Sequence, residues 1–286
     1  ITRRKSPPME KLKLHFVATR MGPLERWWKN FKMNLGIIQG RLSEPTNGHI
    51  QEFPSNWQKE FELLHTCGLA HIEWLITKNT AKTNPAFSKL VSLRELPISS
   101  YCADTLVDTR ITNEKYLQEH LQPICESATR NEVSTITIPL LEASSVEDTG
   151  VRQKFKSLIL EYAKKYPNLK FSFECELSID GLRDILELSD NFYITYDTGN
   201  ITSYGLDHVE YIDAFHQRIN NVHLKDRTYD AKTVHPTTGD TNFELIFDKL
   251  TSVGYNGPYT LQTARGKTGK EVITILQHKN ILEGLY

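Results

Sequence analysis

Short apolar runs alternate with longer amphipathic segments along most of this chain. Eight of the runs have the length and the β-branched or aromatic content typical of buried strands. They lie at 34–38, 71–76, 98–104, 134–140, 169–174, 192–197, 221–225 and 259–262. The segments between them carry apolar residues at helical spacing. They lie at 56–67, 81–93, 113–130, 151–166, 178–188, 208–216, 241–253 and 270–282.

This alternation predicts a single (β/α)8 TIM barrel over residues 33–286. Eight strand–helix units in about 250 residues are the repeat number of that fold. No linker rich in Pro, Gly or Ser interrupts the units, which favours one domain. A doubly wound sheet would have fewer units and a glycine-rich phosphate turn after its first strand. Neither the dinucleotide-binding motif GxGxxG nor the P-loop motif is present.

Charge separates residues 1–32 from the rest of the chain. This segment has nine Lys or Arg and two Asp or Glu, a net charge of +7, which leaves −8 on the remainder because the total is −1. We interpret the segment as a basic extension outside the barrel. It lacks the apolar region of a secretory signal, and an organellar presequence is the alternative. The acidic remainder argues against a nucleic-acid groove.

No apolar run approaches the length of a membrane span, so no membrane partner is expected. The four cysteines show no CxxC or zinc-ribbon spacing; they are Cys67, Cys102, Cys125 and Cys175. In a chain of this size we expect them to be reduced and buried. A cytoplasmic location is the prediction.

Polar side chains end four consecutive predicted strands. They are Glu174 in KFSFE, Asp197 in FYITYD, His223 in NNVHL and Gln262 in PYTLQ. In a parallel barrel these strand ends meet at the C-terminal rim, where the active sites of this fold lie. Two carboxylates, an imidazole and an amide oxygen suit Mn²⁺, Co²⁺, Mg²⁺ or Zn²⁺. The alternative is that each is an ordinary polar residue capping a neighbouring helix or, for Asp197, a turn.

Eight motifs, in their order along the chain, resemble those of the sugar phosphate isomerases/epimerases. These are xylose-isomerase-like TIM barrels of the AP endonuclease family 2 superfamily. The motifs are LGIIQGRLSEP (35–45), AHIEWL (70–75), SSYCAD (99–104), FSFECEL (171–177), YDTGN (196–200), VHLKDR (222–227), TGDTNFELIFDKLTSVGYNGPY (238–259) and TLQTAR (260–265). The resemblance covers the chain from about residue 33 onward.

The resemblance implies a metal-dependent reaction in which a ketose chelates the cation through its carbonyl and a neighbouring hydroxyl. The cation polarises the carbonyl, a carboxylate removes the adjacent proton, and a cis-enediolate forms. Reprotonation of the neighbouring carbon isomerises the sugar, whereas reprotonation of the same carbon from the opposite face epimerises it. In the family's epimerases the first and last ligand carboxylates divide the two proton transfers.

In this chain those two catalytic positions are Glu174 and Gln262. Glu174 can act as the base, but similar sequences usually read LETAR where this chain reads LQTAR, and an amide does not titrate. Gln262 therefore keeps an oxygen for the metal but predicts slow or absent two-base epimerisation. Glu176 and Cys175 are candidates for a replacement acid, against ordinary roles at a helix start and in the core.

Basic residues beyond the last two strands are candidate substrate contacts. Lys225 and Arg227 follow His223, and Arg265 follows the eighth strand. All three could neutralise a substrate phosphate or an enediolate oxygen, since this end of a TIM barrel often binds phosphate. The alternative is that they are surface or ion-paired residues.

Four other residues near the rim are also candidate substrate contacts. Gln39, Arg41 and Glu73 lie at the ends of the first two strands and could bind sugar hydroxyls. His235 lies in the loop after strand seven, where it could contact the substrate or be an ordinary surface histidine.

We therefore predict a metal-dependent isomerase or epimerase of a small ketose or ketose phosphate. The partner would be a small-molecule sugar or sugar phosphate, and assembly as a homo-oligomer is left open. One alternative, suggested by Gln262, is a sugar-binding or regulatory barrel that has lost turnover. The other is an endonuclease-IV-like DNA repair enzyme, which would need a larger His/carboxylate cluster and a basic groove.

Overall fold

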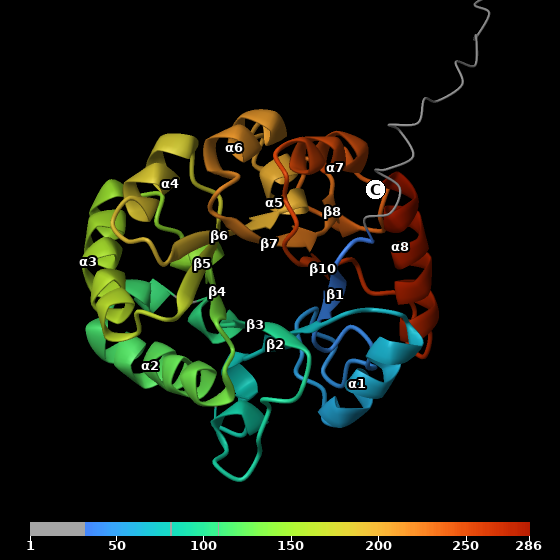
Figure 1. Ribbon diagram of the computed structural model, residues 1–286, viewed down its shortest axis with the longest axis horizontal. Coiled ribbons are helices and arrows are strands. Elements are labelled where there is room, and N and C mark those ends of the chain that lie inside the picture. Colours follow the sequence, from blue (N-terminus) through green and yellow to red (C-terminus); the bar gives the residue numbers. More distant parts are fainter. Residues whose placement is uncertain (1–31, 81, 108) are drawn as a thin grey trace, which may run out of the picture. The chain divides into compact units, whose positions relative to one another are not determined.

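Eight parallel strands close into a barrel in the computed structural model, which describes residues 32–80, 82–107 and 109–286 (Figure 1). Around the ring the order is β1, β10, β7, β6, β5, β4, β3, β2. The bounds are β1 (Leu35–Ile38), β2 (Ile72–Leu75), β3 (Ile98–Cys102), β4 (Thr135–Leu140), β5 (Lys170–Cys175), β6 (Phe192–Asp197), β7 (Ile219–Leu224) and β10 (Tyr259–Leu261). The predicted TIM barrel and its eight strand positions are confirmed.

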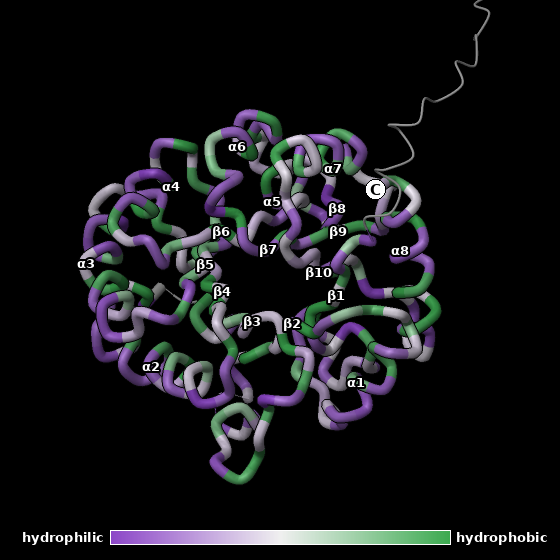
Figure 2. Tube along the Cα trace, in the orientation of Figure 1, coloured by the Kyte–Doolittle hydropathy of each residue, from purple (hydrophilic) through white to green (hydrophobic). Residues whose placement is uncertain are grey.

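Helices surround the barrel, so the strands are covered on their outer side (Figure 1). They are α1 (Trp57–Thr66), α2 (Glu114–Asn131), α3 (Thr149–Lys165), α4 (Ile179–Leu186), α5 (Thr198–Ser203), α6 (His208–Phe215), α7 (Phe243–Ser252) and α8 (Glu271–Leu285). Figure 2 shows hydrophobic positions along the strands and many hydrophilic positions on the outer turns of the helices. In the part of the chain that the structure describes, no helix has the length and hydropathy needed to cross a membrane.

The structure adds one hairpin to the predicted elements and leaves one predicted segment undescribed. After β7 the chain adds a short antiparallel hairpin of β8 (Asp226–Arg227) and β9 (Thr233–Val234), which the pattern did not predict. Apart from residue 32, the predicted basic extension over 1–32 lies outside the described residues, and it stays a prediction.

The predicted helix at 81–93 is wrong. Between β2 and β3 the described residues form only two short 3-10 turns, at Lys78–Thr80 and Pro85–Phe87. Asn84 precedes a proline, and this position disfavours the helical backbone. Its side chain is buried and bonded instead: Oδ1 accepts from Trp74 Nε1 (2.9 Å) and Ala86 N (3.0 Å), and Nδ2 donates to the Leu75 carbonyl (3.0 Å). These bonds compete with helix formation and fix the segment against the C-terminal end of β2.

Substitution Asn84→Ala is therefore expected to lower the free energy of unfolding by about 2–3 kcal/mol, since it leaves buried donors and acceptors without partners. The neighbouring exposed residue provides the control, and Thr83→Ala should change stability by less than about 0.5 kcal/mol. Urea unfolding followed by circular dichroism measures both. Equal stabilities for the two variants would show that the Asn84 bonds do not hold this segment.

A polar network occupies part of the barrel interior and supports the site above it. Thr137 Oγ1 donates to Glu73 Oε1 (2.7 Å) and lies 3.2 Å from Thr195 Oγ1. Asn221 Nδ2 donates to Glu73 Oε2 (3.3 Å), and Thr260 Oγ1 donates to Asn221 Oδ1 (3.0 Å). The bonds of Thr137 to Glu73 and Thr195, and of Asn221 to Glu73, join strands that are not neighbours in the ring, so these side chains point into the barrel.

Candidate metal centre

The four polar residues predicted at the strand ends form the next layer of the barrel interior. Residues two apart on a strand point to the same face. Glu174, Asp197, His223 and Gln262 lie two residues after Ser172, Thr195, Asn221 and Thr260, respectively. The interior polar layer therefore continues upward to the C-terminal rim.

Three of these side chains lie close enough together to hold one cation. Glu174, Asp197 and His223 each offer one ligand atom, and these atoms lie within 4.8 Å of one another. His223 Nδ1 is 3.5 Å from Glu174 Oε2 and 3.9 Å from Asp197 Oδ2, distances too long for good hydrogen bonds. All three side chains are buried.

Three buried atoms of these four residues lack a hydrogen-bond partner among the described residues: Asp197 Oδ2, His223 Nδ1 and Gln262 Oε1. Of these, Asp197 Oδ2 is ion-paired with Lys225 Nζ. A buried polar atom without a partner is costly unless a ligand or an ion satisfies it. The donor set of carboxylate oxygens, an imidazole nitrogen and an amide oxygen fits a hard or borderline divalent cation. The residues present therefore fit the predicted class of metal.

Glu73 determines which nitrogen of His223 faces the cluster. Its carboxylate is fully buried, and Oε2 lies 2.6 Å from His223 Nε2. It therefore accepts the Nε2 proton and leaves Nδ1 facing Glu174 and Asp197. Proteins orient metal-binding histidines in this way. The sequence makes Glu73 a candidate contact for sugar hydroxyls; in the structure its oxygens are bonded to protein groups, and its place suits the positioning of His223.

The charges of the cluster attract a cation. Burial alone would raise the pKa of Glu174, but His223 and Lys225 lower it to about 2. Burial would lower the pKa of His223, but Glu73 and Glu174 raise it to about 10. Burial raises the pKa of Asp197, and the Glu174 charge adds to this. Carboxylates around one imidazole thus draw in a positive charge, and a divalent metal would displace the proton of His223.

The motif YDTGN explains how the two carboxylates are held. Asp197 caps α5: its Oδ1 accepts from the Asn200 backbone amide (2.8 Å). Asn200 Nδ2 donates to Glu174 Oε1 (2.9 Å), so one residue fixes both carboxylates. Sequence reasoning missed Asn200, although the motif contains it. Lys225 Nζ lies 2.7 Å from Asp197 Oδ2 and 4.0 Å from Glu174 Oε1.

A cavity of about 460 Å³ opens above this layer. Five of the predicted site residues line it, and they are Arg41, Glu174, Lys225, Arg227 and Gln262. Its lining also contains three side chains that sequence reasoning did not single out: Cys102, Asp104 and Glu142. The volume suits a small molecule such as a monosaccharide.

Arg41 reaches this cavity from the loop after β1. It is almost fully buried; Nε donates to the Thr263 carbonyl (3.2 Å) and Nη1 donates to the Ile50 carbonyl. Burial and the nearby Arg265 lower the pKa of Arg41 to about 9. The loop is fixed by Glu60, whose oxygens accept from the Gly40 amide (2.9 and 3.1 Å).

The other predicted contacts lie outside the lining of the cavity. Gln39 is fully buried, and its Oε1 accepts from the Leu75 amide (3.1 Å). His235 is exposed, with Nδ1 2.7 Å from His278 Nε2. Arg265 donates through Nε to the Ile50 carbonyl (3.1 Å) and through Nη1 to Ser43 (3.2 Å).

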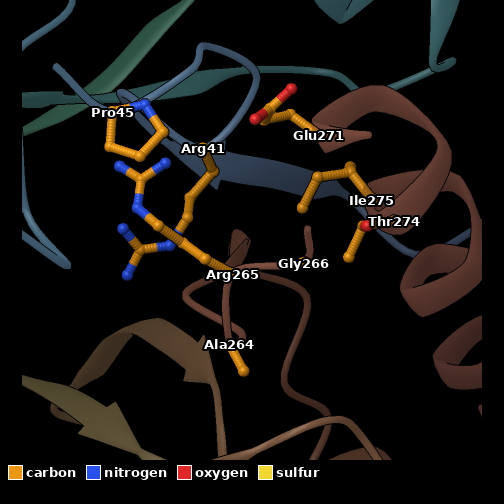
Figure 3. A pocket seen from close by; sticks show the side chains of 8 residues that line it. All are labelled: Arg41, Pro45, Ala264, Arg265, Gly266, Glu271, Thr274 and Ile275. Atoms are coloured by element: carbon orange, nitrogen blue, oxygen red, sulfur yellow. The ribbon is translucent and has the colours of Figure 1, made fainter. Parts of the chain in front are cut away.

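Arg265 borders a separate crevice. Figure 3 shows its guanidinium group beside that of Arg41, next to Pro45. The crevice has a volume of about 20 Å³, which is room for a single water molecule and not for a sugar phosphate. The hydrogen bonds of Arg265 to Ser43 and Ile50 instead stabilise the loop that follows Arg41.

The model of the xylose isomerase-like TIM barrel family matches residues 61–279 of the sequence. The chain belongs to this family, as its motifs predicted. No curated protein matches the sequence.

Solved structures with the same fold include the following three. A 3-keto-D-glucoside 4-epimerase, YcjR from E. coli, is 15% identical with a TM-score of 0.63, covering 88% of this chain and 100% of that one. The IOLI protein with a bound zinc atom is 14% identical with a TM-score of 0.67, covering 89% and 99%. A D-allulose 3-epimerase from Methylomonas sp. is 13% identical with a TM-score of 0.65, covering 90% and 99%.

Proposed function

We propose that this protein is a divalent-metal-dependent isomerase or epimerase of a small ketose or ketose phosphate. The observation that carries the proposal is the unpartnered Nδ1 of His223, held by Glu73 and facing Glu174 and Asp197 beneath a sugar-sized cavity. Two structures of the same fold are described as sugar epimerases and a third as zinc-bound. These likenesses support the proposal at the level of reaction class.

Each residue of the site has a role in the proposed reaction. A divalent cation held by Glu174, Asp197, His223 and Gln262 would supply the Lewis acidity that makes the proton next to a substrate carbonyl removable. Glu174 is ionised near neutral pH and lines the cavity, so it can accept that proton. Lys225 and Arg227 line the same cavity and can stabilise negative charge on the enediolate oxygens or on a phosphate.

The proposed function predicts proton exchange between ketoses and solvent. The protein is incubated with Mn²⁺ or Co²⁺ in D₂O with a panel of free ketopentoses, ketohexoses and their phosphates. Deuterium should enter the carbon next to the carbonyl of at least one sugar, seen by proton NMR. Absence of exchange across the panel, with the metal bound, would contradict the proposal.

The same assay tests the second candidate, a sugar-binding barrel without turnover, which the amide at Gln262 favours. Such a protein would gain thermal stability from a bound sugar, because a ligand of the folded state stabilises it, but it would exchange no proton. For the DNA-repair alternative, the described residues offer a single three-residue cluster for metal, smaller than several zinc ions require. A cytoplasmic location stays a prediction, and assembly as a homo-oligomer stays open.

A further inference from the structure

The amide of Gln262 leaves the proposed reaction with one titratable carboxylate among the predicted catalytic positions. Inversion of a carbon centre needs a proton to leave from one face and another to arrive at the opposite face. We propose that Asp104, at the end of β3, is the second proton-transfer group. This inference rests on the proposed function and goes beyond the predicted ligand set.

The backbone around Asp104 is tightly fixed. The Ala103 amide donates to the Thr137 carbonyl on β4 (2.9 Å), and the Thr105 amide donates to the Ile76 carbonyl after β2 (2.8 Å). The Leu106 amide closes a 3-10 turn, Asp104–Leu106, onto the Ala103 carbonyl (2.9 Å). Bonds to two neighbouring strand segments therefore hold the Cα position of Asp104, as a preorganised group requires.

The carboxylate itself has no structural task among the described residues. The turn begins at Asp104, but its N-cap is Ala103, and no side chain caps it. No hydrogen bond or ion pair of the Asp104 carboxylate occurs with any described residue, unlike Asp197, which caps α5, or Asp226, which binds backbone amides. A half-buried carboxylate on a fixed backbone is thus available to a ligand.

Asp104 also lies at the cavity in which the substrate would bind. It lines the 460 Å³ cavity together with Glu174 and Gln262. In the ring of strands β3 and β5 lie on the two sides of β4, as Figure 1 shows. Asp104 follows β3 and Glu174 lies on β5, so a substrate in the cavity would meet the two carboxyl groups from different directions.

The surroundings of Asp104 suit proton transfer near neutral pH. Burial, then the charges of Glu174 and Glu142, raise the pKa of Asp104 to about 6, against an opposing effect of Arg41. A bound cation would offset the charge of Glu174, whereas burial and Glu142 act in either state. The neighbouring thiol of Cys102 stays neutral because burial and nearby carboxylates raise its pKa well above the usual value. Two carboxyl groups with separated pKa values in one cavity form an acid–base pair.

The proposed step is balanced with these two groups. Glu174 takes the proton from the carbon next to the carbonyl, and the electron pair of that bond forms the enediolate. Protonated Asp104 then gives its proton to the same carbon from its own side of the cavity, and the carbonyl is restored. Glu174 ends protonated and Asp104 ends ionised, and both return to their starting forms by exchange with water.

The test compares Asp104→Asn with wild type in the D₂O assay, with the metal content of both measured. Exchange without inversion should persist, because Glu174 can return a deuteron to the face from which it took the proton. Formation of the inverted ketose should fall about 10²–10⁴-fold relative to exchange. Asp248→Asn, the same substitution at an exposed position on α7, is the matched control and should change neither rate.

A second measurement does not depend on turnover. In metal-free protein carrying ¹³C-labelled aspartate carboxyls, one signal should titrate near 6 in wild type and be missing in Asp104→Asn. An ordinary acidic midpoint for that signal would overturn the inference. So would an unchanged ratio of inversion to exchange in Asp104→Asn, or a wild-type enzyme that isomerises without inversion. No exchange by the wild type would contradict the proposed function itself, and the role of Asp104 with it.

Discussion

The variant Glu174→Gln should lose about 10²–10⁴-fold of the solvent-exchange rate while the barrel stays folded. The substitution preserves the size of the side chain and the Asn200 contact to an oxygen, but it removes the group that accepts the carbon proton. The rate is measured by NMR in D₂O on the ketose that exchanges with wild type.

Loss of metal is the competing explanation for a slow Glu174→Gln enzyme, so the assay is run at saturating Mn²⁺ with bound metal measured in parallel. A variant that holds metal but exchanges slowly identifies Glu174 as the base. A variant that holds metal and exchanges at the wild-type rate would show that another group removes the proton.

The variant Glu73→Gln should bind Mn²⁺ or Co²⁺ about 10–100-fold more weakly, although Glu73 does not line the cavity. The neutral amide still reaches His223 Nε2, but it carries no negative charge. The imidazole therefore becomes a weaker ligand for the cation. Isothermal titration calorimetry measures the affinity. Glu95→Gln, a charge-neutralising change at an exposed position, should leave the affinity unchanged. Equal affinities for wild type and Glu73→Gln would mean that Glu73 does not strengthen metal binding by His223.

The strands were predictable because barrel strands are buried on both faces and therefore appear as short apolar or β-branched runs. The segment at 81–93 shows the limit of this reasoning. Its apolar residues have helical spacing, but Asn84 bonds across to Trp74 and Leu75, and these contacts exist only after folding. The local spacing of apolar residues cannot predict that a side chain will form hydrogen bonds with a strand about ten residues earlier.

The candidate ligands were predictable because consecutive parallel strands end at one rim, so a polar residue at each end suffices to place the cluster. The supporting contacts were not. Glu73 and His223 are 150 positions apart, and their 2.6 Å contact depends on the register of strands that are not neighbours. The position of His235 in a loop leaves open a substrate contact or a surface role, and the sequence does not reveal its pairing with His278 on α8.

Metal binding by the cluster of Glu174, Asp197 and His223 is the central claim, and metal content tests it most directly. Wild type and His223→Ala are incubated with Mn²⁺ or Co²⁺, desalted and analysed by plasma mass spectrometry, with thermal unfolding recorded beside it. Wild type should retain about one ion per chain and unfold at higher temperature with metal, since a ligand of the folded state stabilises it. His223→Ala should retain almost none and show no shift. Wild type that retains no metal and shows no shift, or His223→Ala that retains as much as wild type, would contradict the account.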